Sequence, residues 1–172
     1  KSYIEEKTGA CIFVGDYEKI TVCDDKLKTS QFLKENGFCY PKTYTLSNVQ
    51  DNLKYPLILK TRSGCGSKNI HRIENRKELD SFHTDDNYIL QEYLNGDEFT
   101  AGIYLGNDGE VKGSCIFKRS LKDGSTYYAE RIIDSKIEDY LNSIAKQLKL
   151  KYLNIQYRMK DGVPCPFEFN GR

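Results

Sequence analysis

The chain has 172 residues, a length that suits one domain or two small subdomains. Hydrophobic residues make up 38% and charged residues 30%, so the chain can form a core and is not compositionally disordered. The formal net charge of +1 argues against a strongly basic nucleic-acid binder. No apolar run approaches the roughly 18–20 residues of a membrane span, and the N-terminus has no signal-peptide core. The composition favours a soluble domain.

The six cysteines form no CxxC pair, and neither histidine lies at metal-ligand spacing from them, so a structural zinc site is not expected. Several cysteines fall in apolar stretches, such as residues 11–14 and 114–117, where a free cysteine behaves as a small core residue. Reduced thiols in the cytoplasm are the simplest interpretation.

In the N-terminal half, short strands are expected to alternate with helices. Residues 10–14 and 20–23 are predicted to be extended around a turn at Gly15. Asp24 and Asp25 offer N-cap chemistry, and Gly37 a stop, for a helix over about 26–36. The next elements expected are strands at 57–61, 69–73 and 88–92, with a short helix to about residue 82 that begins at a capping box at 75–78.

In the C-terminal half, β-hairpins flank the most regular helix of the chain. A turn at 106–109 predicts a hairpin of strands 99–105 and 111–118, followed by a strand at 125–133. Apolar residues recur with helical spacing over 137–148, after a second capping box at 135–138. Strands 153–159 and 166–170 form the last hairpin. Runs of strands separated by single helices predict an α+β fold.

The last hairpin alternates apolar and polar residues on both strands. A three-residue loop at 161–163 places Gln156 opposite Glu168 and keeps Phe167 and Phe169 together on the apolar face. The same register places Asn154 opposite Asn170. A two-residue turn would exchange the faces of one strand, so we favour the longer loop. The resulting carboxylate and amide oxygens suit Mg²⁺, although an ordinary solvated hairpin face is the alternative.

A glycine-rich basic loop follows strand 57–61. Gly64 and Gly66 allow a tight turn that presents backbone N–H groups, while Ser67 and Lys68 add donors, as expected of a phosphate site. The loop matches neither GxxxxGK[ST] nor GxGxxG, and a plain hairpin loop is the alternative. Lys60 lies in the apolar strand before the loop, where a lysine is disfavoured unless it has a partner such as a phosphate.

Residues 89–99 form a strand that runs into a bend. Its backbone can offer hydrogen bonds to a flat base, and a carboxylate such as Glu98 can accept from ribose hydroxyls. A strand end with solvated acids is the alternative.

In this order the motifs resemble the ATP-grasp superfamily, in particular the branch related to the carbamoyl-phosphate synthase large subunit. The matching stretches are Asp25-Lys26 with Phe32, Leu33 and Gly37, Tyr55–Lys60 with Gly64–Ser67, Leu90–Leu94 with Gly96 and Glu98, Asn154–Gln156, and Phe167–Arg172. The resemblance implies two α+β subdomains built on antiparallel sheets with ATP between them. It also implies activation of a carboxylate as an acyl phosphate, which an amine or similar nucleophile attacks.

The resemblance further implies roles for individual residues. Phosphates would be contacted by Lys26, Lys60 and the loop that includes Gly64, Gly66, Ser67 and Lys68. Glu92, Tyr93 and Leu94 would frame the adenine, and Glu98 would hold the ribose. Mg²⁺, or Mn²⁺ as the alternative metal, would bind Gln156, Glu168 and Asn170. Arg172 and Arg119 would stabilise charge on the transferring phosphoryl group.

The expected organisation is a tail of a preceding domain or linker at 1–24 and an ATP-grasp domain at 25–172, with a small lid-like part at about 45–92 and a larger part at 93–172. The family usually has proline at the position of Gly171, which predicts a looser turn there. Expected partners are ATP, an unidentified carboxylate and amine, and an N-terminal domain or partner subunit, without nucleic acid or membrane. The alternatives are a nucleotide-binding module without turnover and, because of the 13 tyrosines, a single-stranded nucleic-acid binder.

Overall fold

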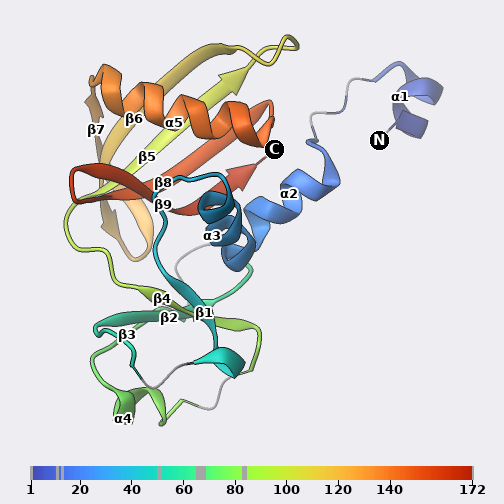
Figure 1. Ribbon diagram of the computed structural model, residues 1–172. Helices are drawn as coiled ribbons and strands as arrows, with labels where there is room; N and C mark the ends of the chain where they lie inside the picture. Colours follow the sequence, from blue (N-terminus) through green and yellow to red (C-terminus); the bar gives the residue numbers. More distant parts are fainter. Residues whose placement is uncertain are drawn as a thin grey trace.

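The computed structural model describes residues 2–10, 12, 14–49, 52–64, 69–82 and 85–171, and Figure 1 shows them arranged around two separate antiparallel sheets. The helices and the two sheets together give the expected mixed α+β architecture. None of the helices in the described part of the chain is long and apolar enough to cross a membrane.

The smaller sheet has four strands in the order β1-β4-β2-β3. Their bounds are Thr43–Thr45 for β1, Leu57–Thr61 for β2, His71–Ile73 for β3 and Tyr88–Glu92 for β4. A 3-10 turn, η1 (Leu46–Asn48), and α4 (Arg76–Leu79) lie in its connections. The sheet packs on a small cluster of buried apolar residues: Leu57, Leu59, Ile73, Leu79 and Leu90. Strand β1, which the sequence patterns did not predict, pairs with β4.

The larger sheet has five strands in the order β7-β6-β5-β8-β9. Their bounds are Glu98–Leu105 for β5, Val111–Lys122 for β6, Ser125–Ile132 for β7, Tyr152–Lys160 for β8 and Val163–Gly171 for β9. Helix α5 (Ser135–Leu148) lies across one face of this sheet, as Figure 1 shows. Alternate residues of β5, such as Ala101 and Ile103, are buried beneath it in the main core.

The N-cap of α5 differs from the expected capping box. Asp134 caps the helix by accepting from the backbone N–H groups of Lys136 and Ile137, at 3.0 and 3.2 Å. Glu138 instead accepts a hydrogen bond from the Ser114 hydroxyl on β6. The capping-box assignment to Ser135 was therefore wrong, because Asp134, an equally good capping residue one position earlier, takes the N-cap.

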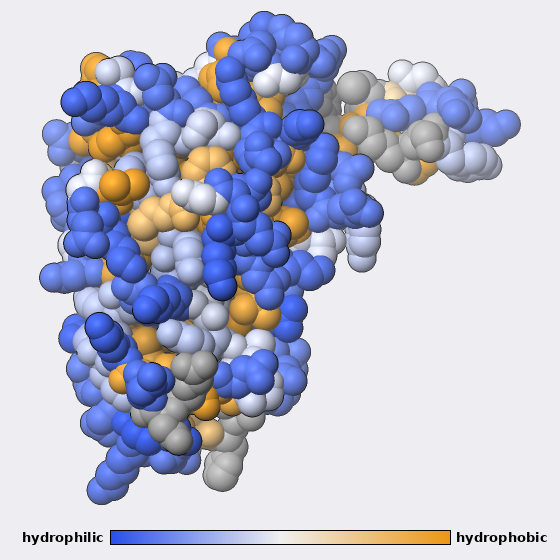
Figure 2. Space-filling model, in the orientation of Figure 1, coloured by the Kyte–Doolittle hydropathy of each residue, from blue (hydrophilic) through white to orange (hydrophobic). Residues whose placement is uncertain are grey.

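Three helices precede the smaller sheet: α1 (Ser2–Thr8), α2 (Tyr17–Asp24) and α3 (Lys26–Glu35). Helix α3 and its N-cap Asp25 confirm the prediction, and Gly37 has a φ of +75°, as expected after a helix end. The extended assignment of 20–23 was wrong. Asp16 caps α2, and the helix packs on β9 with Cys23 in the core, so tertiary contacts override the β-branched residues. In Figures 1 and 2, α1 projects away from the body.

Gly171, at the end of β9, allows α2 to approach closely. A Cβ at this position would lie 2.7 Å from Cδ1 of Leu150 and 2.8 Å from Sγ of Cys23. The expectation of a looser turn was therefore wrong, because Gly171 belongs to a strand that is tightly packed. Burial raises the pKa of the Cys23 thiol to about 12, against a weaker lowering by a backbone hydrogen bond from Gly171.

The hairpin of β8 and β9 has the predicted cross-strand pairs, Gln156 opposite Glu168 and Asn154 opposite Asn170. The predicted loop was wrong: Lys160 pairs with Val163, so the turn has only two residues, both with positive φ. The register is restored by a bulge, because Tyr157 pairs with Pro166 and Phe167 is the extra residue. Phe169 stays in the core, whereas Phe167 lies at the opening between the two sheets.

Among the cysteines that the structure describes, all are free. Cys23 and Cys165 are buried, Cys39 is half-buried, and Cys115 is exposed. The expectation that Cys115 lies in the core was wrong, since in the 114–117 stretch it is Ile116 that points to the core and Cys115 lies on the opposite face. Cys11 and Cys65 lie outside the described residues.

Candidate active site

A cavity of about 120 Å³ lies between the two sheets. Five of the residues proposed from the sequence line it: Lys60, Glu92, Tyr93, Leu94 and Glu98. Sequence reasoning missed the other lining residues, which are Ile58, Ile70, Gln91, Arg158 and Phe167. The cavity is smaller than the roughly 300 Å³ at which whole-ligand pockets begin, so it suits one flat part of a larger ligand.

Lys60 lies on β2 and is buried, with 6% of its surface exposed. No described residue forms a hydrogen bond or ion pair with its ammonium, whose Nζ lies 5.3 Å from the centroid of the Phe167 ring. Burial lowers the pKa of Lys60 to about 8, and the nearby Glu168 carboxylate opposes this shift. A buried cation without a partner favours an anionic ligand.

The end of β4 and the bend after it offer backbone groups to the cavity. The carboxylate of Glu92 is occupied by Lys160 Nζ at 2.6 Å and by the backbone N–H of Lys42 at 3.0 Å. The carbonyl of Leu94 accepts from Arg158 at 3.0 Å, whereas the N–H of Leu94 has no partner within the described ranges. A flat base can therefore use this N–H as a donor.

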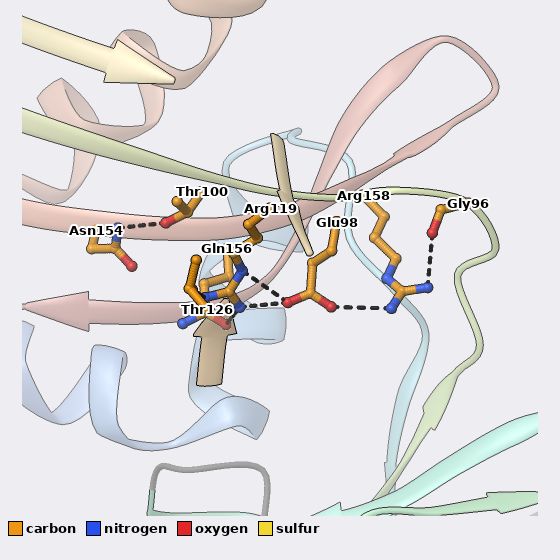
Figure 3. A network of polar contacts seen from close by, with 8 residues as sticks. All are labelled: Gly96, Glu98, Thr100, Arg119, Thr126, Asn154, Gln156 and Arg158. Carbon is orange, nitrogen blue, oxygen red and sulfur yellow. Dashed lines mark hydrogen bonds and ion pairs between the residues drawn. The ribbon is translucent and has the colours of Figure 1, made fainter. Parts of the chain in front are cut away.

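Glu98 begins β5 and lies between two arginines, as Figure 3 shows. The sheet register explains this arrangement, because Glu98 pairs directly with Arg119 of β6 and with Arg158 of β8. One carboxylate oxygen accepts from Arg119, and the other accepts from Nη2 of Arg158 at 3.0 Å. The three side chains are mostly buried, with 12–26% exposed. The polar alternation of β8 was the signal for Arg158.

Arg119, Glu98 and Arg158 together are called the charged row below. The proposed metal ligands lie on adjacent strands next to it. Gln156 is paired with Glu168, and its Oε1 accepts from Nη2 of Arg119 at 2.7 Å. Asn170 is paired with Asn154, whose amide donates to Thr100 at 2.6 Å. Among the described residues, no three His, Cys, Asp or Glu side chains gather as a metal site. The set therefore contains one carboxylate and otherwise amide oxygens, which are hard ligands for Mg²⁺.

Helix α3 is joined to the loop after β2. Lys26 is buried, and its Nζ donates to the carbonyl of Gly64 at 2.7 Å. Arg62 forms a bidentate ion pair with Asp25, with the shortest N–O distance at 2.7 Å. Burial raises the pKa of Asp25, but the hydrogen bonds from Arg62 and the helix N-terminus outweigh it and hold the pKa below its ordinary value. Residues 65–68 and 172 lie outside the described part of the chain. They include four residues proposed from the sequence: Gly66, Ser67, Lys68 and Arg172.

Comparison with known protein families shows to which family this chain belongs. A model described as an ATP-grasp domain matches residues 23–148, more than half of the chain. The chain belongs to the ATP-grasp family. The family resemblance inferred from the motifs is confirmed.

Curated relatives in the ATP-grasp family include ligases and carbamoyl phosphate synthase. D-Alanine–D-alanine ligase A of Bacillus cereus is 26% identical over 87% of this chain and 58% of its own length. The carbamoyl phosphate synthase large chain of Thermoanaerobacter is 27% identical over 96% of this chain and 18% of its own length. The chain therefore spans little more than half of the ligase and less than a fifth of the synthase.

The biotin carboxylase–β-γ-ATP complex of Campylobacter jejuni is a structural neighbour. Its TM-score is 0.78 at 16% identity, and the match covers 99% of this chain and 45% of that one. At this identity the likeness shows the fold alone. It supports the arrangement of two sheets that the motifs predicted.

Proposed function

We propose that this chain is an ATP- and Mg²⁺-dependent module that activates a carboxylate for ligation. A carboxylate oxygen attacks the γ-phosphorus, and the bond to the bridging oxygen of ADP breaks. An amine or similar nucleophile then attacks the acyl carbon of the acyl phosphate, and the C–O bond to phosphate breaks so that inorganic phosphate leaves. The observation that carries the proposal is the buried ammonium of Lys60, which has no hydrogen-bond or ion-pair partner among the described residues, at a cavity between the sheets. The family supports ATP as the anion that meets it.

The residues present fit this ligand. Lys26 and Lys60 would contact phosphates, together with the loop that contains Gly64. The backbone of Tyr93 and Leu94 would hold the base, and Glu98 the ribose hydroxyls. The bound metal would neutralise phosphate charge and polarise the transferring group. The oxygens of Glu168, Gln156 and Asn170 would hold that metal, and Arg119 would stabilise charge that develops on the phosphoryl group.

The identity of the carboxylate and of the nucleophile is a separate proposal. The sequence motifs favoured a carbamoyl-phosphate synthase-like reaction. The ligase of Bacillus cereus and the synthase of Thermoanaerobacter align at nearly equal identity, 26% and 27%. We therefore propose the class, a carboxylate–amine ligase that acts in the cytoplasm, and test carbamoyl-phosphate chemistry as one member of it.

A second candidate function is nucleotide binding without turnover. It is favoured by one observation: the described residues proposed as metal ligands include one carboxylate, that of Glu168. An N-terminal domain or partner subunit would then complete the catalyst. Under this proposal ATP binds the isolated chain, but no carboxylate and amine pair releases ADP.

Thermal unfolding with Mg-ATP tests both candidates. Binding at 100 times Kd stabilises a protein by about 2.7 kcal/mol, so a clear rise in Tm is expected. Glu168→Gln is expected to abolish carboxylate-dependent ADP release while the Tm rise with ATP alone, without metal, persists. Glu130→Gln, an exposed change on β7, is the matched control. No Tm rise with Mg-ATP would contradict both candidates, and ADP release unaffected by Glu168→Gln would contradict the proposed site.

A further inference from the structure

A second, larger hollow of about 450 Å³ lies on the same face of the five-stranded sheet as the charged row. Residues paired across strands share a face, and so do every second residues of one strand. Glu98, Thr100, Gly102 and Tyr104 of β5 therefore form successive levels of this face. Glu98 lines the cavity next to β4, and Gly102 and Tyr104 line the hollow.

The proposed metal ligands lie between the cavity and the hollow. Gln156 and its partner Glu168 are at the level of Thr100, and Asn154 and Asn170 are at the level of Gly102. Both asparagines also line the hollow. A molecule in the hollow would therefore reach the phosphate-transfer site from the side opposite the cavity at Lys60.

The floor of the hollow is open because two residues have no side chain. A Cβ at Gly113 would meet no atom within 4 Å, and one at Gly102 would meet only Sγ of Cys115, at 3.5 Å. Neither glycine has positive φ, so backbone conformation does not require them. Glycine inside a strand weakens it, and a close approach by a ligand is a reason to have it there.

The wall of the hollow is aromatic, and its described lining residues are uncharged. Tyr104 and Tyr152 are stacked, with ring centroids 5.1 Å apart and an interplanar angle of 16°. None of the described residues that line the hollow carries a charge. A charged substituent placed here would lose hydration without gaining a partner, whereas a planar apolar ring would gain contact with the tyrosines and the glycine floor.

We propose that this hollow, which we call the uncharged hollow, binds the organic part of the carboxylate substrate and selects one that bears an aromatic ring. The proposal rests on the proposed function. The carboxylate would lie at the end formed by Asn154 and Asn170, and the ring would lie against Tyr104 and Tyr152. Among the described lining residues, none is a charged partner for an acidic or basic side group, which disfavours such substrates.

The exposed thiol of Cys115 provides a readout that needs no turnover. The full chain with Mg-ADP is treated with N-ethylmaleimide, and modification of the Cys115 peptide is followed by mass spectrometry. The probes are 3-phenylpropanoate, propanoate and glutarate, which differ in the group at the far end. We expect 3-phenylpropanoate to slow the modification at least fivefold relative to propanoate, and glutarate to have no effect. Equal protection by all three, or none, would overturn the proposal.

A variant that fills the hollow makes the test specific. Gly113→Val adds a side chain where the structure has open space, so it is expected to fold, and it should abolish the protection by 3-phenylpropanoate. Ser120→Val, on the opposite face of β6, is the matched control and should leave the protection intact. Protection that persists in Gly113→Val would overturn the proposal.

The Tm rise with Mg-ATP is measured on the same samples and separates the two proposals. A normal rise without ring-dependent protection overturns only the substrate class. Ring-dependent protection without any Mg-ATP effect supports the hollow but contradicts the ligase function.

Discussion

The two sheets contribute to the candidate site in different ways. The five-stranded sheet contributes side chains held in cross-strand rows, such as Arg119, Glu98 and Arg158. The four-stranded sheet contributes a cavity wall, backbone groups and the buried ammonium of Lys60. Its buried cluster is also much smaller than the main core. The comparison indicates that one side of the site is rigid and pre-organised, while the other is the less stable part of the fold.

Truncation of one core residue in each sheet should separate their stabilities. Leu59→Ala and Ile155→Ala each remove a fully buried side chain, and each is expected to cost about 2–5 kcal/mol. Because the cluster around Leu59 is small, its loss should increase hydrogen exchange in β1–β4 and leave β5–β9 protected. Ile155→Ala should lower the global free energy of unfolding. Uniform loss of protection in Leu59→Ala would show that the two sheets unfold as one unit.

Replacing Lys60 should strengthen the fold and weaken the site. Its folded-state pKa of about 8 lies below the ordinary value of 10.5, so the charged form is penalised in the native state. At about 1.4 kcal/mol per pKa unit, Lys60→Met should be more stable at pH 7 by an amount on the order of 3 kcal/mol. Affinity for Mg-ATP should fall by about tenfold or more, because a charged hydrogen-bond partner is lost. A destabilised Lys60→Met would contradict this account.

The pH dependence gives an independent check. Between about pH 8 and 10.5 the unfolded chain binds more protons at Lys60 than the folded chain does, so this residue makes the free energy of unfolding rise with pH. Below pH 8 both states carry the proton and the penalty is complete. The slope of the free energy of unfolding against pH, measured by urea unfolding across this range, should be more positive in the wild type than in Lys60→Met, because the buried Cys23 thiol contributes equally to both.

Glu98→Gln tests the charged row of the larger sheet. Two mostly buried arginines would lose their carboxylate, and we expect a loss of about 2–3 kcal/mol, reduced from the cost in a fully buried pair by partial exposure. Asp97→Asn breaks the exposed ion pair with Lys118 and should change stability by less than about 0.5 kcal/mol. Urea unfolding of the two variants is the measurement. Equal effects would mean that the row is no more organised than the surface.

Glycine substitutions in the larger sheet should have the smallest effects. Gly171→Ala places a Cβ against Leu150 and Cys23 and should cost about 1–2 kcal/mol. Gly113→Ala meets no atom and should change the free energy of unfolding by less than about 0.5 kcal/mol. Thermal unfolding compares them, and a larger cost for Gly113→Ala would contradict the packing described for Gly171.

Local patterns predicted the elements with strong periodicity or caps. Helix α3 follows from Asp25 and Gly37, and the apolar alternation of β8 gives the correct partner for Glu168. Tertiary packing explains the main errors. Ile20 and Cys23 lie in a helix because α2 packs on β9, and β1 is a strand because it completes the edge of β4. Such contacts between distant segments leave no short-range signal.

The sequence predicted only some of the residues that line the candidate site. Lys60 was conspicuous as a cation in an apolar strand, and Glu98 followed a bend. Arg158 and Phe167 were not proposed as site residues. Arg158 is positioned by the register of three strands, and Phe167 reaches the cavity only because of a bulge. Alternation alone placed Phe167 beside Phe169 in the core, since it cannot detect an extra residue in one strand.

Because of that extra residue, the effect of an insertion or deletion in the last hairpin depends on whether it adds or removes an odd or an even number of residues. A two-residue turn and one bulge together place Glu168 opposite Gln156, on the face of the sheet that carries the charged row. A single insertion or deletion between Gly162 and Glu168 would therefore turn the acid toward the core and a phenylalanine toward solvent. A change of two residues would preserve the faces. Length variation in this stretch is therefore expected to occur in even steps, and an odd step would remove the proposed metal site without altering any of its residues.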